Sequence, residues 1–116
     1  MTSDGVSSDL IRGNIDAIIL RHLYDGDNYG YEIIKSVGKN SQGRYELKEP
    51  SLYTSLRRLE SQKLIASYWG TESRGGRRKY YSITPAGAEA YREHLAAWKT
   101  AKEIIDRLIE RPEERT

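Results

Sequence analysis

Residues 74–81, with the sequence RGGRRKYY, decide how the fold of this chain is interpreted. A glycine pair surrounded by cations runs directly into an aromatic segment, which residues 82–84 continue and Pro85 ends. Gly-Gly favours a hairpin turn, and Tyr, Ile and Thr favour strands. Residues 71–79 carry three Arg, one Lys and one Glu, a formal charge of +3, whereas the whole chain carries +2. We therefore predict a β-hairpin with a basic tip, a shape that fits against phosphates.

The side chains of the returning strand are expected to alternate between two faces. Tyr81 and Ile83 then share one face and Tyr80 and Ser82 the other, so one tyrosine is expected in the core. The glycine pair has a plain structural explanation, a turn that needs positive φ. That explanation is compatible with backbone amides that lie near a phosphate.

Length and composition exclude several classes of protein. At 116 residues the chain has the size of one domain with room for an additional helix. A hydrophobic content of 37% is low for a freestanding globule, which suggests that a partner chain contributes to stability. The absence of cysteine excludes disulfides, thiolate zinc sites and cysteine nucleophiles. The polar first residues argue against a signal peptide, and no apolar run approaches the roughly 20 residues of a membrane span. We predict a cytoplasmic protein with no membrane partner.

Hydrophobic periodicity and turn residues divide the chain into helices and one hairpin. In chain order we expect a helix over residues 10–24, a turn at 25–28, a helix over 29–39, a polar connector at 40–48, a helix over 50–62, strands at 64–69 and 78–84, and a helix over 85–110. Three helices followed by a hairpin are typical of a winged helix-turn-helix. The predicted fold is therefore mainly α with a small β-hairpin, with a DNA-binding domain over residues 1–84 and a dimerisation helix with a short tail over 85–116.

The third helix has the side chains of a DNA-reading helix. Small polar groups at Ser51 and Thr54 can approach bases closely, Tyr53 can donate its hydroxyl to a phosphate, and Arg57 can reach a base edge or the backbone. With Arg74, Gly76, Arg77 and Lys79 of the hairpin, these residues are the predicted DNA-binding set. Charged outer faces are common, so Arg57 and Arg58 have the alternative role of solvating an exposed face.

The last helix carries an apolar stripe along its length. Its positions Tyr91, Leu95, Trp98, Ile105 and Ile109 fall at steps of three and four, and Lys102 interrupts the series. A helix with such a face that projects past a small domain is expected to pack on a partner helix. The predicted homodimer interface is listed here: Ile11, Tyr91, Leu95, Trp98, Ile105, Leu108 and Ile109.

Three motifs of this chain resemble those of the PadR family of transcriptional regulators. Residues 25–33, DGDNYGYEI, are similar to the glycine-tyrosine-glutamate signature of that family, and residues 51–65 are similar to its recognition-helix signature. Residues 75–81 with TPAG at 84–87 complete the resemblance, which extends over residues 10–108. The short last helix with a central tryptophan is similar to that of the small subfamily, which includes multidrug-binding repressors.

The resemblance implies a homodimeric repressor that binds a pseudo-palindromic operator and exchanges its last helix across the dimer. It further implies a central pore in which the two copies of Trp98 face each other and enclose planar aromatic compounds. The positions that match pore-lining positions are Leu10, Ala17, Arg21, Leu95, Trp98 and Lys102. The alternative role of Trp98 is an anchor of the dimer interface.

Two departures from the family pattern bear on this implication. Lys102 stands where drug-binding relatives have an acidic residue, and Arg21 adds a second cation, so neutral or anionic aromatic ligands are expected rather than cationic ones. Lys63 stands where the family usually ends the recognition helix with glycine. A lysine there must adopt a left-handed cap or let the helix end differently.

An enzyme and a protein-interaction module are the alternatives to a DNA-binding regulator. His22 and His94 are isolated, and neither a nucleophile–base motif nor metal-ligand spacing occurs in the sequence, so no catalytic residue, metal or cofactor is predicted. A winged-helix module that binds only protein is expected to have an acidic or apolar wing. The basic wing of this chain favours DNA.

Overall fold

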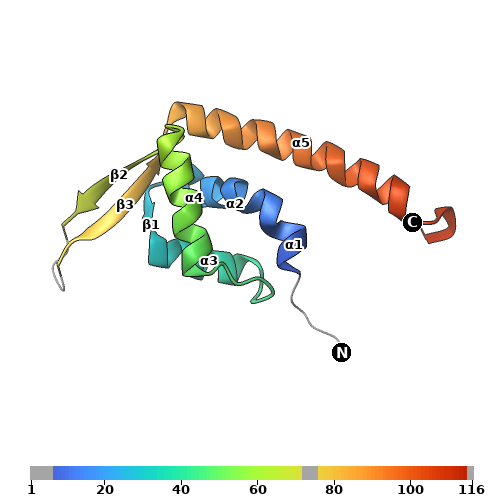
Figure 1. The fold of residues 1–116 in the computed structure, drawn as a ribbon, viewed down its shortest axis with the longest axis horizontal. Coiled ribbons are helices and arrows are strands. Elements are labelled where there is room, and N and C mark those ends of the chain that lie inside the picture. Colours follow the sequence, from blue (N-terminus) through green and yellow to red (C-terminus); the bar gives the residue numbers. More distant parts are fainter. Residues whose placement is uncertain (1–6, 72–75, 115–116) are drawn as a thin grey trace.

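The computed structural model describes residues 7–71 and 76–114 (Figure 1). Its elements follow in chain order: α1 Ser8–Ile11, the 3₁₀ turn η1 Arg12–Asn14, α2 Ile15–Tyr24, β1 Asn28–Tyr29, α3 Gly30–Asn40, α4 Glu49–Ser61, β2 Ile65–Gly70, β3 Arg78–Ile83, α5 Pro85–Ile109 and the 3₁₀ turn η2 Pro112–Glu114. The predicted winged helix-turn-helix is confirmed, with α4 as its third long helix and β2–β3 as the wing.

One core joins the helix-turn-helix to the base of the wing. Its buried side chains come from α2, α3, α4, the sheet and the connector before α4 and are listed here: Ile19, Leu20, Leu23, Ile33, Val37, Leu47, Leu52, Leu56, Leu59, Ile65 and Tyr81. The expectation of a core tyrosine is met by Tyr81. Leu47 lies in the segment predicted to be a polar connector, and because it is a single apolar residue it produced no periodic signal.

The sheet has three antiparallel strands in the order β1-β3-β2, one more than the predicted hairpin. The additional strand, Asn28–Tyr29, pairs with Tyr81 and Tyr80 of β3. A two-residue strand is too short for an alternating pattern, so only tertiary pairing reveals it. It joins the start of α3 to the wing.

The first predicted helix is interrupted, which corrects the expectation of one helix over residues 10–24. The 3₁₀ turn at residues 12–14 separates α1 from α2. Gly13 and Asn14 are poor helix formers, and a tighter turn at this point redirects the chain. As a result Leu10, counted in the apolar stripe of that helix, is 73% exposed.

A compact joint holds the end of α4, the wing and the start of α5 together. Lys63 has φ of +63°, so it takes the left-handed cap that glycine would take without strain. The Thr84 backbone N–H donates to the Leu64 carbonyl at 3.0 Å, and the Thr84 hydroxyl donates to the Lys63 carbonyl at 2.8 Å. The same hydroxyl accepts the Gly87 N–H and caps α5. A Cβ at Gly87 would overlap the Leu64 carbonyl, so the close approach requires glycine.

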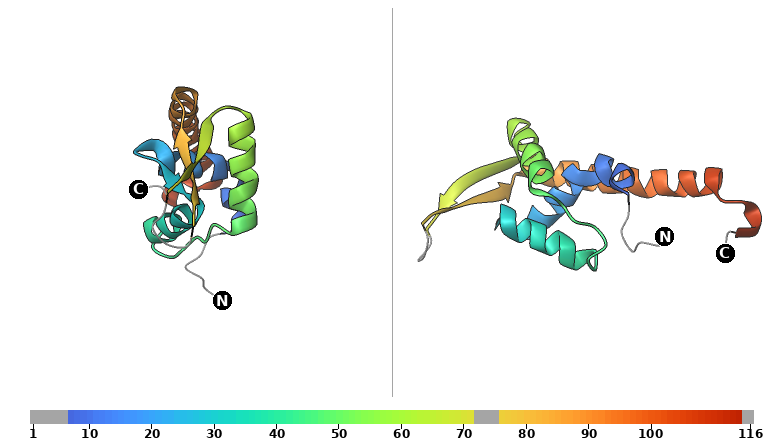
Figure 2. Two further views of the ribbon diagram at one scale, coloured as in Figure 1. Left: turned by 90° about the vertical axis from the view of Figure 1, so that its left-hand side faces the viewer. Right: turned by 60° about the horizontal axis from the view of Figure 1, so that its bottom comes forward.

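Helix α5 runs along one side of the body and continues beyond it, away from the wing (Figures 1 and 2). Its N-terminal half packs on α2, where the Tyr24 and Tyr91 rings are 5.0 Å apart and Arg92 donates to the Tyr24 hydroxyl at 2.9 Å. The molecule measures 58 × 35 × 21 Å. None of the helices in residues 7–71 and 76–114 has the length and apolar character needed to cross a membrane.

Candidate nucleic-acid interface and adjoining cavity

Helix α4 presents the predicted DNA-reading residues on its solvent side. Leu52, Leu56 and Leu59 bury the opposite side in the core. Ser51, Thr54 and Arg57 are exposed, and Tyr53 is 38% exposed at the edge of the helix nearest the wing. The four predicted residues of this helix therefore lie outside the core and are available to a ligand.

Arg58, the neighbour of Arg57, forms an ion pair and a hydrogen bond within the chain. Its guanidinium donates to both carboxylate oxygens of Asp16 at 2.9 and 2.7 Å and to the Ser55 hydroxyl at 3.0 Å. Burial alone would raise the pKa of Asp16, but the hydrogen bonds from Arg58 and Ser55 outweigh it and hold that pKa below its ordinary value. The pair joins α2 to α4 over 42 residues of chain. Sequence reasoning missed Asp16, because such a pair carries no local signal.

The Gly30-Tyr31-Glu32 motif has a steric explanation at Gly30. A Cβ there would overlap the Tyr53 hydroxyl and contact Leu52, so glycine lets the Tyr53 ring lie over the start of α3. Tyr53, Gly30, Lys79 and Tyr81 line a shallow basin of about 310 Å³ between α4, α3 and the wing. This contact places the predicted phosphate ligand Tyr53 beside a cation of the wing.

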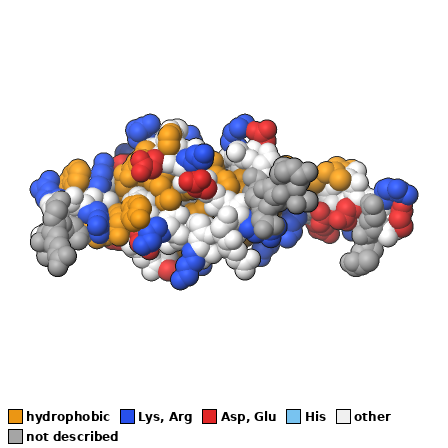
Figure 3. All heavy atoms as spheres, turned by 90° about the horizontal axis from the view of Figure 1, so that it is seen from below, with side chains coloured by type: hydrophobic (Ala, Val, Ile, Leu, Met, Phe, Trp, Pro, Cys, Tyr) orange, Lys and Arg blue, Asp and Glu red, His pale blue; other side chains and the backbone are white. Residues whose placement is uncertain are grey.

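The wing carries its predicted cations next to an exposed aromatic side chain. The Arg77 guanidinium lies 5.3 Å and the Lys79 ammonium 6.0 Å from the centre of the Trp69 ring. Gly76 has φ of +94°, which agrees with the turn explanation of the glycine pair. Arg74, also in the predicted DNA-binding set, falls outside the described residues. In Figure 3, Lys and Arg side chains flank hydrophobic ones at the left-hand end, where the wing lies.

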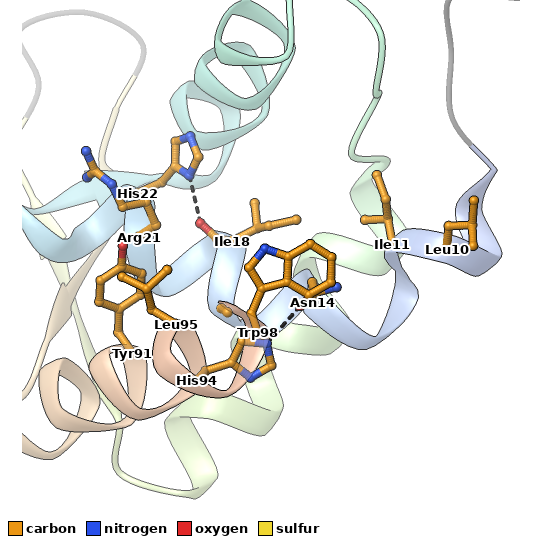
Figure 4. Close-up of a pocket in the computed structure, with 11 residues that line it drawn as sticks. Leu10, Ile11, Asn14, Ile18, Arg21, His22, Tyr91, His94, Leu95 and Trp98 are labelled. Atoms are coloured by element: carbon orange, nitrogen blue, oxygen red, sulfur yellow. Dashed lines mark hydrogen bonds between the residues drawn. The ribbon is translucent and has the colours of Figure 1, made fainter. Parts of the chain in front are cut away.

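A second feature lies on the other side of the body, where α1 and α2 face α5 (Figure 4). It is a cavity of about 470 Å³, within the usual range of small-molecule sites. Its lining residues are Leu10, Ile11, Asn14, Ala17, Ile18, Arg21, His22, Tyr91, His94, Leu95 and Trp98. Five of the six predicted ligand-binding residues are thus brought together. Lys102, the sixth, lies one turn beyond Trp98 on α5 and does not line the cavity of this chain.

The amide, guanidinium and imidazole side chains that line the cavity each have a hydrogen-bond or ion-pair partner within the chain. His94 Nε2–H donates to the Asn14 side-chain oxygen at 2.8 Å. His22 Nδ1–H donates to the Ile18 carbonyl at 2.7 Å, while its Nε2 accepts from Asn40. Arg21 pairs with Asp25 at 3.1 Å. The two isolated histidines of the sequence therefore hold helices together, and the pairing of Arg21 reduces the positive charge that it offers to a ligand.

Large apolar side chains of the distal part of α5 are open to solvent in the single chain. Leu108 is 78% and Ile109 74% exposed, and Ile104, Ile105 and Trp98 are about half exposed. Tyr91 and Leu95 of the predicted dimer interface are half-buried within the chain, as is Ile11. The apolar stripe therefore divides into a proximal part that this chain covers and a distal part that it does not.

A winged helix-turn-helix with a polar recognition helix and a basic wing defines a class of DNA-binding regulators. Residues 19–93 match the model of the Transcriptional regulator PadR-like family, and the chain belongs to that family. It is therefore a regulator of transcription rather than an enzyme, and the family resemblance of the sequence motifs is confirmed.

The chain is also similar to individual proteins over most of its length. A solved transcriptional regulator from Clostridium thermocellum, Cth-833, is 42% identical with a TM-score of 0.83, covering 89% of this chain and 100% of that one. A PadR family transcription regulator from hypervirulent Clostridium difficile R20291 is 37% identical with a TM-score of 0.74, covering 84% and 100%. Uncharacterized protein X of Lysinibacillus sphaericus is 43% identical over 105 residues, 90% of this chain and 96% of that protein.

Proposed function

We propose that this regulator acts in the cytoplasm as a homodimeric repressor on a pseudo-palindromic operator, with α4 in the major groove and the wing on the neighbouring backbone. The main support for the proposal is that α4 and the wing form one continuous surface. Tyr53 of α4 and Lys79 of the wing line the same basin, and the exposed Arg57 follows one turn further along α4. Polar groups that reach bases and cations that reach phosphates thus come from adjacent elements.

The dimer is supported by the uncovered distal stripe of α5. Exposed apolar residues at positions 104, 105, 108 and 109 form a continuous face on a helix that extends beyond its own body. Burial of each such side chain against a second copy contributes on the order of 1 kcal/mol or more. In this dimer the predicted interface residues pack around a two-fold axis, and the two α4 helices read two half-sites.

The cavity supports a role for a planar aromatic ligand that releases the operator. Its walls are mainly apolar, and Trp98, which lines it, is 41% exposed as a residue, so its side chain is accessible for stacking. In the dimer, a second copy of α5 closes this rim and brings Lys102 toward it. The expected ligands are neutral or anionic. Drug-binding relatives have an acidic residue at the position of Lys102, and a lysine there disfavours cationic compounds.

The DNA proposal is tested by titrating a labelled duplex from upstream of the gene at several salt concentrations. Replacement of Arg77 and Lys79 by Ala is expected to weaken binding to all sequences and to lower the salt slope by about 2, because two phosphate contacts are lost. Selective loss for one sequence would show that the wing reads bases. Absence of a salt-sensitive complex with wild-type protein would favour a protein-interaction module instead.

The ligand proposal is tested with Trp98→Ala. We expect the variant to remain dimeric in sedimentation and to lose the fluorescence quenching that neutral planar dyes cause in the wild type. A matched cationic dye of the same shape should bind more weakly to the wild type. Dissociation of the dimer on this substitution would assign Trp98 to the interface and contradict the ligand role.

A further inference from the structure

Trp69 is a large exposed residue that the predicted DNA-binding set does not contain. It lies near the end of β2 opposite Lys79 of β3, and 57% of its surface is exposed. Exposed tryptophans that lie next to cations at the edge of a fold are commonly found at interfaces. The question is which side of the wing this ring occupies.

The ring lies on the side of the wing that faces α4. Strand alternation places Ile65, Ser67 and Trp69 on one face of β2. Ile65 is in the core, and the Ser67 hydroxyl donates to Glu60 of α4 at 2.6 Å. Trp69 is the next residue of this series, beyond the end of the core, so its ring extends the α4 side of the wing toward the tip.

The opposite face of the wing is occupied by a different group of rings. Tyr68 stacks on Tyr80 at 5.7 Å, Tyr80 meets the Tyr29 ring edge-on at 5.5 Å, and the Tyr68 hydroxyl donates to Asp27 at 2.6 Å. These contacts fasten the wing to β1 and the turn before it. Tyr68 therefore has a structural role within the chain, whereas Trp69 lies beside the cationic side chains of Arg77 and Lys79.

We propose that Trp69 is a DNA-contacting residue of the wing, which holds Arg77 and Lys79 in position and rests against the sugar–phosphate backbone of the operator. This proposal rests on the docking of α4 and the wing on duplex DNA proposed above. The charge of this site indicates an anionic partner. Arg77 and Lys79 lie beside the same ring and repel each other, and a phosphate between them would relieve that repulsion.

The indole supplies two physical contributions to such a contact. Cations that are already stacked on a ring lose less side-chain freedom when they bind a phosphate, since part of the ordering precedes binding. The indole Nε1–H is a hydrogen-bond donor only, and within residues 7–71 and 76–114 it has no hydrogen-bond partner. A phosphate oxygen beside the two cations can accept it.

The first test compares Trp69→Leu with Tyr68→Phe, a change one residue away on the opposite face that keeps the Tyr68 ring stacked on Tyr80. We expect Trp69→Leu to weaken binding of the labelled upstream duplex about five- to tenfold, the size of a partly desolvated cation–π and stacking contact. Tyr68→Phe should leave duplex affinity near that of the wild type, because the ring stack that fastens the wing is retained. Circular dichroism should first show that both variants are folded. Equal affinities of Trp69→Leu and wild type would overturn the proposal.

A double-mutant cycle tests whether the indole acts through the cations. Arg77→Ala should weaken binding less in the Trp69→Leu protein than in the wild type, because the ring no longer holds the guanidinium. Additive effects would mean that Trp69 does not position Arg77, and would overturn that part of the proposal.

A spectroscopic test observes Trp69 itself in the wild-type protein and uses a variant only to assign its signal. The chain has two tryptophans, so 5-fluorotryptophan labelling gives two fluorine resonances, which Trp69→Leu assigns. The Trp69 resonance is expected to shift when the upstream duplex saturates the protein. If the duplex binds but the Trp69 resonance does not change, only the contact with Trp69 is refuted. If the wild type fails to bind the duplex, the proposed function itself is refuted.

Discussion

The helix-turn-helix body and the distal half of α5 contain the same kind of apolar periodicity but differ in what covers it. In α4 the periodic leucines at positions 52, 56 and 59 are fully buried by α2, α3 and the sheet. Among the 25 residues of α5, only Gly87 is fully buried. The apolar side of α4 is therefore buried by this chain itself, while the distal half of α5 leaves its apolar side chains exposed. Periodicity identifies an apolar stripe, but it does not say which chain covers it.

Gly87→Ala is expected to have the largest effect, because it breaks the joint between the body and α5. The new Cβ overlaps the Leu64 carbonyl, a backbone atom that cannot move without disturbing the Lys63 cap and the Thr84 contacts. The loss in free energy of unfolding should be about 3 kcal/mol or more, measured by urea denaturation. Gly38→Ala is the matched control, since a Cβ there meets nothing within 4 Å and should leave stability equal or slightly higher. A small effect at position 87 would mean that the joint adapts.

Replacing both Leu108 and Ile109 by Glu should abolish the dimer while the body remains folded. The two side chains are the most exposed apolar groups of α5, and a carboxylate in an apolar interface carries a penalty of several kcal/mol. Sedimentation equilibrium should show a monomer with native circular dichroism. Lys99→Glu, at an exposed position on the side of the helix opposite this stripe, should remain dimeric. A dimer that survives the double substitution would place the interface elsewhere.

Gly30→Ala should reduce DNA binding more than stability. The Cβ displaces the Tyr53 ring from its position over the start of α3, and because this ring is partly exposed it can swing into solvent. We expect about a tenfold loss of duplex affinity with a loss of at most about 1 kcal/mol in stability. Tyr53→Phe keeps the ring and removes the hydroxyl, so it separates the packing role from the phosphate contact. Normal duplex affinity in Gly30→Ala would show that the position of Tyr53 is unimportant.

Asp16→Asn should have the smallest effect, with a characteristic dependence on pH. The pKa of Asp16 is lower in the folded protein than its ordinary value of 3.8, so the pair with Arg58 stabilises the fold above that pH. The contribution is lost as the pH falls below about 4 and the carboxylate takes up a proton. Since both partners are partly exposed, the difference between wild type and variant should be about 1 kcal/mol at neutral pH. A difference that persists at low pH would contradict the assignment to this ion pair.

The sequence predicted the long helices, the two main strands and, as ligand-binding positions, five of the eleven residues that line the cavity. These elements follow from features that act over short stretches of chain, such as apolar spacing. Pro50 and Pro85 stand in the first turns of α4 and α5, and the Thr84 side chain caps α5. The break at Gly13, the strand at residues 28–29 and the buried Leu47 were missed. The short strand and the burial of Leu47 depend on contacts with residues distant in sequence, which no window along the chain contains. Gly13 and Asn14 are a local signal, but the apolar spacing on both sides outweighed it in the prediction.

The candidate DNA surface shows the same limit at single residues. Arg57 and Arg58 are equivalent in the sequence, yet Arg58 is bound to Asp16 while Arg57 is exposed on the outer face of α4. Trp69 and Tyr68 are adjacent aromatic residues of one strand, but they lie on opposite faces with different neighbours. Register and helix packing assign the two roles, and both are properties of the assembled sheet and bundle.

The sequence by itself determined the class of fold, the basic wing and the family, because turn chemistry, charge and periodicity act over short stretches of chain. Only the tertiary structure decided that Arg57 rather than Arg58 is available to DNA and that glycine is required at positions 30 and 87. It also decided which part of α5 keeps its apolar side chains exposed. These depend on distances between segments that lie tens of residues apart, where a single methyl group or a bidentate ion pair determines how closely two elements approach.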